Sequence, residues 1–180
     1  IAGLALYDWI SSGARDPLLI AATSIGFGLL LWAADRFADR LSEQRSGLDS
    51  LSWMDVLWIG LAEAVALVPG TSRSGATITA ALFLGLGREA AARFSFLLAV
   101  PVGIAALVVD LRELLSHGPG EGGWAPLVVG YLVAAVAAWV VIDWLLAWLR
   151  RRDMTIFVAY RLILGLVLLI LGLLLAMLGL

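Results

Sequence analysis

The feature that most constrains this chain is a set of long apolar stretches separated by short polar segments. A helix needs roughly 20 apolar residues to cross a bilayer core about 30 Å thick. The chain is 62% apolar, whereas soluble domains are usually about 45–50% apolar, so much of its surface must face lipid. The sequence therefore predicts an all-α, polytopic integral membrane domain. Its predicted spans are residues 17–34, 90–109 with an interruption at Pro101, 124–149 and 155–180.

Composition excludes several classes of function. The net charge of −2 and the lack of a long basic stripe argue against nucleic-acid binding. The chain has no cysteine, which excludes disulfides and thiolate metal sites. Its single histidine, His117, cannot build a multi-histidine metal centre, and we predict that it is solvated in a loop outside the membrane.

The beginning of the chain is apolar but short. Residues 1–10 are too few to span a bilayer alone, and no initiator methionine precedes them. We therefore expect these residues to be the tail of a truncated span. On this interpretation residues 1–180 are a single membrane domain that lacks an N-terminal segment.

Arginine placement predicts the orientation of the spans. We assume that the segment between residues 53 and 86 enters and leaves the membrane on the same side. One face of the membrane then holds the polar stretch 35–49, the turn 87–89 and the 150–152 run. The opposite loops contain Arg15 and Arg112. The positive-inside rule then makes the arginine-rich face cytoplasmic. The arginines on that face are Arg36, Arg40, Arg45, Arg88, Arg150, Arg151 and Arg152.

Residues 53–86 differ from the four spans. Two half-length apolar arms, 53–68 and 76–86, flank a hinge rich in proline, glycine and serine at 69–75. Because each arm is too short to cross a bilayer, the pattern indicates a re-entrant helix–loop–helix. Non-helical backbone at membrane depth occurs only where it is buried in protein or lines a wet cavity, and broken helices commonly carry binding sites. The alternative is a loop at the interface between two short membrane helices.

The polar residues of this hinge predict an anion-binding site. A charged side chain at membrane depth is costly unless it is paired or hydrated, which makes Arg73 a candidate functional residue. A helix expected to start after Gly75 would direct unpaired N–H groups and its positive dipole end at the same point. An arginine fork with hydroxyl donors suits phosphate or carboxylate. The alternative is an ordinary serine N-cap with Arg73 reaching the interface. The predicted anion-binding residues are Gly70, Ser72, Arg73, Ser74 and Thr77.

Three other charged residues lie in apolar surroundings. Glu63, on the first arm, could pair with Arg73, help to bind a cation, or act as an acid or base. Asp143 and Arg161 lie in the third and fourth predicted spans. Since a short turn separates these two spans, we predict that Asp143 and Arg161 pair and fix the packing of the two helices.

The hinge carries a family signature. The stretch Pro69–Thr77 reads Pro-Gly-Thr-Ser-Arg-Ser-Gly-Ala-Thr. It resembles the second signature, Pro-Gly-x-Ser-Arg-Ser-x-x-Thr, of bacterial undecaprenyl-diphosphate phosphatases of the bacitracin-resistance type. Residues 60–67, 93–101 and 159–161 are similar to that family too. The likeness covers essentially the whole chain but only the C-terminal two-thirds of a typical member.

The resemblance implies an inner-membrane hydrolase that removes the terminal phosphate of undecaprenyl diphosphate and so recycles a lipid carrier for cell-wall synthesis. Its fold would be two inverted repeats, each with a re-entrant pair. Arg73 would clamp the diphosphate, with Ser72, Ser74 and Thr77 bonding its oxygens. Arg73, Ser72 and Glu63 are the candidate catalytic residues, and a divalent cation, Mg²⁺ or Ca²⁺, would neutralise charge. The partners implied are a polyprenyl diphosphate and membrane lipids, and a homodimer is left open.

The family's first signature, a Glu-x-x-x-Glu pair followed by Pro-x-Ser-Ser-x-Gly-His, does not occur in these 180 residues. That signature supplies the proposed nucleophile and base, so we expect the chain to be inactive alone. In addition, Glu63 stands where glutamine is more common. Two alternatives use the same architecture: a transporter or flippase for a phosphorylated lipid or other anion, and a structural membrane subunit with a degenerate site.

Overall fold

The computed structural model describes residues 16–119 and 123–178, and its regular elements are helices joined by short loops. Within these described residues, four helices are long and apolar enough to cross a membrane, which confirms an all-α polytopic protein. The predicted tail at residues 1–10 and Arg15 lie outside the described residues. The long helices are α3 (Pro17–Asp39), α6 (Arg88–His117), α7 (Trp124–Leu149) and α8 (Thr155–Leu178), and the short elements are η1 (Leu48–Ser50), α4 (Trp53–Val65) and α5 (Arg73–Phe83).

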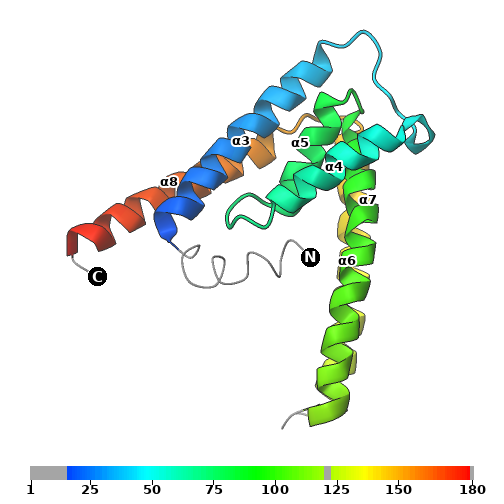
Figure 1. Cartoon of the computed structure of the whole chain (residues 1–180), viewed down its shortest axis with the longest axis vertical. Helices are drawn as coiled ribbons and strands as arrows, with labels where there is room; N and C mark the ends of the chain where they lie inside the picture. Colours follow the sequence, from blue (N-terminus) through cyan, green and yellow to red (C-terminus); the bar gives the residue numbers. More distant parts are fainter. Residues whose placement is uncertain (1–15, 120–122, 179–180) are drawn as a thin grey trace.

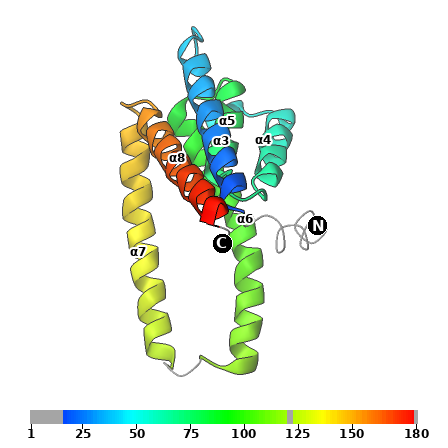
Figure 2. The same ribbon diagram turned by 90° about the vertical axis from the view of Figure 1, so that its left-hand side faces the viewer.

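The long helices form two groups. Helices α3 and α8 pack along each other, while α6 and α7 extend together beyond the rest of the molecule (Figures 1 and 2). The predicted interruption of α6 at Pro101 is wrong, since the helix continues through it. A proline removes only its own N–H bond, and membrane helices tolerate this. Helix α7 buries only Leu149, as expected of a helix whose surface faces lipid.

Glycines bring α3 and α8 into close contact. A Cβ atom added at Gly165 would lie 2.6 Å from Ile25 Cγ1, and one at Gly28 would lie 3.3 Å from Arg161 Cβ. Gly172 is similarly crowded by α3. Small residues of this kind let the backbones of two membrane helices approach closely. The packing therefore fixes Arg161 of α8 directly against α3.

Ion pairs join the helices at the arginine-rich end. Arg88 at the start of α6 contacts Asp35 at 2.6 Å and Asp39 at 2.7 Å, both on α3. Arg150, after α7, contacts Glu89 at 2.8 Å. These contacts confirm that the polar stretch 35–49, the turn 87–89 and the 150–152 run share one face. The assignment of that face to the cytoplasm stays a prediction.

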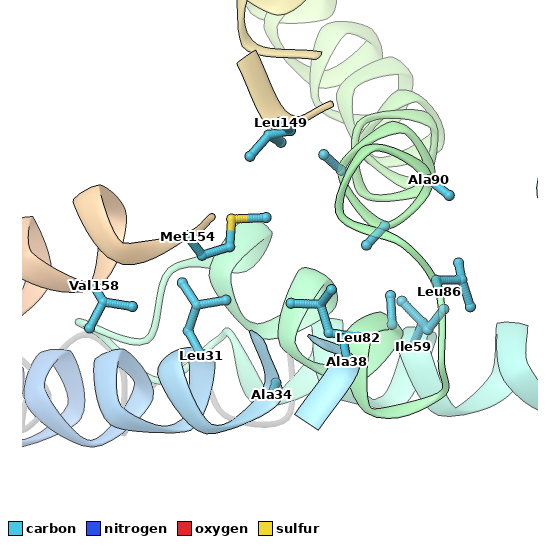
Figure 3. Close-up of a cluster of buried hydrophobic side chains, with 13 residues drawn as sticks. Leu31, Ala34, Ala38, Ile59, Leu82, Leu86, Ala90, Leu149, Met154 and Val158 are labelled. Atoms are coloured by element: carbon cyan, nitrogen blue, oxygen red, sulfur yellow. The ribbon is translucent and has the colours of Figure 1, made fainter. Parts of the chain in front are cut away.

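The hydrophobic core lies next to this face (Figure 3). It fills the space between α4, α5, the ends of α3 and α7, and the beginnings of α6 and α8. Its largest fully buried apolar side chains are Ile59, Leu82, Leu86 and Met154. The core therefore anchors the short helix α5 among the long ones.

The predicted hairpin forms from α4, a loop and α5, which pack against each other. With 13 and 11 residues, the two helices are about 20 Å and about 17 Å long at 1.5 Å per residue. Each is shorter than the roughly 30 Å core of a bilayer. These lengths agree with a re-entrant hairpin, which stays a prediction, as does the inverted-repeat architecture.

Candidate functional site

The hinge between α4 and α5 is held against α3. The Thr23 hydroxyl donates to the Pro69 carbonyl at 2.7 Å, and the Ser24 hydroxyl donates to the Gly70 carbonyl at 3.2 Å. Gly70 has a φ of 86°, and a Cβ atom there would lie 2.7 Å from the Ile20 carbonyl oxygen. Only glycine suits both the conformation and the space. The hinge is thus a defined structure in contact with a spanning helix.

Helix α5 begins inside the signature. Ser72 is its N-cap, and the Ser72 hydroxyl accepts from the Gly75 N–H at 3.2 Å. The helix therefore starts at Arg73, and the prediction that it starts after Gly75 is wrong because the capping serine comes earlier. The N–H groups of Arg73 and Ser74 have no partner among the described residues, as expected in a first turn. This end of α5 can receive an anion.

Ser72 itself adopts a strained backbone conformation. Its φ is 65°, and it is the non-glycine residue with positive φ in the described part of the chain. Such conformations cost on the order of 1–3 kcal/mol and persist where the surrounding structure enforces them. Here the strain orients the Ser72 side chain at the N-terminus of α5. It marks this turn as a candidate functional position.

Arg73 and Glu63 meet across the hinge. Arg73 Nε lies 3.9 Å from Glu63 Oε1, so one of the three interpretations of Glu63, the ion pair, occurs in the structure. The Arg73 side chain is 49% exposed, compared with 18% for Glu63. A long, exposed ion pair of this kind contributes little stability. The Arg73 guanidinium can therefore leave Glu63 for a ligand at small cost.

A cavity of 480 Å³ lies beside the hinge. Ser72, Ser74 and Gly75 face it from α5, Ser24 from α3 and Arg161 from α8, whereas Arg73, Glu63 and Thr77 do not line it. The polar residues gather at the hinge, and the remaining wall is mostly apolar. The apolar wall includes Ile78, Phe96, Leu145, Phe157 and Leu164.

Arg161 belongs to this site, which the sequence did not reveal. Its Nη2 donates to the Gly70 carbonyl at 2.8 Å and its Nε to the Ser24 carbonyl at 3.3 Å. The predicted pair with Asp143 is wrong, because α8 packs on α3 and Asp143 is exposed on α7. The similarity of residues 159–161 to the family was the one signal that could have indicated a role at the site.

Thr77 occupies a different environment from the other signature residues. Its side chain is buried, and its hydroxyl lies 2.7 Å from the Ser95 hydroxyl on α6 and also bonds to carbonyls of the first turn of α5. The structure therefore does not bring Thr77 to the cavity. In this structure the Thr77 hydroxyl instead links α5 to α6.

The described residues contain no group of three or more Asp, Glu or His side chains that could hold one metal ion. His117 is exposed, as predicted, although it is the last residue of α6 and does not lie in a loop. Mg²⁺ and Ca²⁺ need several oxygen ligands, which phosphates of a substrate can supply in part. Residues 16–119 and 123–178 thus do not fit a cation site built from protein ligands alone.

Fold and site together define a polytopic, all-helical membrane protein with a short, capped helix pair beside an amphiphilic cavity. Comparison with known proteins identifies it further. The model of the family "Bacitracin resistance protein BacA" matches residues 1–167, and the chain belongs to this family.

Relatives with assigned names support this membership. The chain is 53% identical over 168 residues to "Undecaprenyl-diphosphatase" of Magnetococcus marinus, an alignment that covers 93% of the chain and 61% of the relative. It is 47% identical over 169 residues to "Undecaprenyl-diphosphatase 2" of Stutzerimonas stutzeri, covering 94% of the chain and 62% of the relative. The chain thus spans about three-fifths of the length of these relatives.

Proposed function

We propose that this chain forms the diphosphate-binding half of an undecaprenyl-diphosphatase, which hydrolyses undecaprenyl diphosphate to undecaprenyl phosphate and phosphate. The observation that carries the proposal is the amphiphilic cavity, with serines and a helix N-terminus at the hinge and an apolar wall beside them. A prenyl diphosphate has the same two-part chemistry. The names of the relatives support this choice of substrate.

Binding follows from the chemistry of the hinge. The hydroxyls of Ser72 and Ser74 and the free N–H groups at the start of α5 bond phosphate oxygens, and the positive end of the helix dipole attracts their charge. Arg73 leaves its loose pair with Glu63 and clamps the diphosphate. Gly70 keeps the hinge against α3, and Thr77 holds α5 in place through α6. Positioned charge of this kind supplies most of the catalysis in phosphoryl transfer.

Each of the three candidate catalytic residues has a role in the proposed reaction. Arg73 stabilises charge on the phosphates, Ser72 orients them, and Glu63 holds Arg73 in the unliganded state. The nucleophile and the base are proposed to be groups outside the described residues. The divalent cation implied by the resemblance, Mg²⁺ or Ca²⁺, belongs to the proposal as a ligand of the substrate phosphates, with Glu63 as the nearest carboxylate of the hinge.

We also propose the membrane in which the protein acts and the cellular process that it serves. The protein acts in the bacterial inner membrane, with its arginine-rich face in the cytoplasm, and serves lipid-carrier recycling, cell-wall synthesis and bacitracin resistance. Its partners are the polyprenyl diphosphate and membrane lipids. A homodimer is part of the proposal, and cross-linking in membranes would test it.

A binding experiment tests the proposal on the purified chain in lipid nanodiscs. We expect farnesyl diphosphate to bind more tightly than farnesol, and Arg73→Ala to weaken diphosphate binding about 10- to 100-fold, the range of a charge-assisted hydrogen bond. Arg93→Ala is a matched control, because Arg93 is 51% exposed in a similarly loose ion pair. Equal affinity of the unmodified chain for the diphosphate and the alcohol would contradict the proposal.

A further inference from the structure

Arg161 is a buried charge without a carboxylate partner. The residue is 8% exposed, and no Asp or Glu of residues 16–119 or 123–178 forms a salt bridge with it. Its two hydrogen bonds go to backbone carbonyls. Carbonyl dipoles satisfy donors but do not neutralise a charge, and an uncompensated charge in a low-dielectric site is costly. The described residues therefore supply no counter-charge to Arg161.

The free side of the guanidinium faces the start of α5. Nη1 of Arg161 has no hydrogen-bond partner among the described residues, and it lies 2.8 Å from the position that a Cβ atom at Gly75 would take. Gly75 belongs to the first turn of α5, and its lack of a side chain permits this approach. Two positive features, the guanidinium and the helix N-terminus, thus converge at the wall of one cavity. They repel each other unless an anion lies between them.

We infer that Arg161 is a second cation of the anion site and binds a phosphate oxygen of the ligand through Nη1. The inference rests on the proposed function and adds a residue outside the signature. Nε and Nη2 stay bonded to Ser24 and Gly70, so the same side chain holds the hinge and the ligand. Arg73 approaches from the hinge and Arg161 from α8. The ligand class is a diphosphate, either as a lipid headgroup or as the free anion.

The test measures dissociation constants of the purified chain in nanodiscs for farnesyl diphosphate, inorganic diphosphate and farnesol. We expect Arg161→Gln to weaken binding of farnesyl diphosphate about 10- to 100-fold and to change farnesol binding less than about twofold. Arg161→Lys restores part of the loss because it keeps the charge. Arg112→Gln, an exposed arginine on α6, serves as the control and leaves all three constants unchanged. Comparable losses for inorganic diphosphate would assign the contact to the phosphates alone, and a loss confined to farnesyl diphosphate would assign it to the lipid headgroup.

Two results would overturn the inference. In the first, Arg161→Gln lowers diphosphate and farnesol affinity equally or lowers neither, as for a residue that only anchors the hinge. In the second, the ¹⁵Nη resonances of Arg161 in the unmodified chain, assigned with Arg161→Lys, do not shift on adding farnesyl diphosphate. The second measurement needs no neutral variant to fold. If Arg73→Ala loses diphosphate selectivity while Arg161→Gln keeps it, the inference fails and the proposed function stands.

Discussion

Replacing Gly70 by alanine tests whether the hinge has a positive φ at Gly70 and lies directly against α3. An alanine at a φ of 86° is strained by about 1–3 kcal/mol. Its Cβ would also lie 2.7 Å from the Ile20 carbonyl oxygen and 3.0 Å from Ile20 Cα, with Thr23 Oγ1 closer still. Because α3 is fixed by its packing on α8, the hinge must move away. The hydrogen bonds from Thr23 and Ser24 to the hinge carbonyls would then be lost, at about 1 kcal/mol each.

We therefore expect Gly70→Ala to lower the free energy of unfolding by about 3–5 kcal/mol, measured by steric trapping in bicelles. Gly103→Ala is the matched control: Gly103 lies in α6 with no atom within 4 Å of its added Cβ, so alanine should stabilise that helix by about 0.5–1 kcal/mol. Adding Thr23→Ala to Gly70→Ala should recover only part of the loss, since the clash with the Ile20 backbone remains. Unchanged stability of Gly70→Ala, or full recovery in the double variant, would refute the reasoning.

Two further predictions concern residues that hold the short helices α4 and α5 in place. The hydrogen bond from Arg45 at 2.7 Å and the backbone N–H of Ser52, the N-cap of α4, lower the pKa of Asp55 from 3.8 to about 2. Asp55 should therefore contribute about 2 kcal/mol of stability, which is complete above about pH 4 and is lost as the pH falls toward 2. Unfolding free energies measured at several pH values should show this slope in the unmodified chain and not in Asp55→Asn, and equal slopes would count against the prediction. Thr77→Val should lower the free energy of unfolding by about 1–3 kcal/mol, because it leaves the Ser95 hydroxyl without its partner. Thr77→Ser keeps the hydroxyl and should not lower it. A selective loss of diphosphate affinity in Thr77→Val would instead place Thr77 in contact with the ligand.

The parts of the fold that depend on local sequence could be predicted. The lengths of the apolar stretches predicted the four spans, because a helix must be apolar over the full thickness of the bilayer to cross it. The short apolar arms on either side of the hinge predicted the helical hairpin. The ion pair between Glu63 and Arg73, which the structure contains, was one of the three roles that the sequence allowed for Glu63. The start of α5 was placed too late, because several residues of the signature can cap a helix and only the folded hinge selects Ser72.

The parts that depend on which helices are neighbours could not be predicted. Arg161 was paired with Asp143 because their spans are adjacent in sequence, whereas the glycines of α8 bring it against α3 and the hinge. The signature predicts Thr77 as a ligand contact, and nothing in the sequence indicated that its hydroxyl also bonds to Ser95 on α6. The Asp143 pairing is wrong because a one-dimensional pattern contains no information on helix packing, whereas contact of Thr77 with the ligand stays a prediction.

The most direct test of the central claim is a structure of the purified chain bound to a non-hydrolysable prenyl diphosphonate. We expect the phosphorus atoms to lie at the N-terminus of α5, within reach of Ser72, Ser74 and Arg161, and the prenyl chain to follow the apolar wall past Phe157. Phosphonate groups bound elsewhere, for example at the arginines of residues 150–152, with the hinge cavity empty, would contradict it.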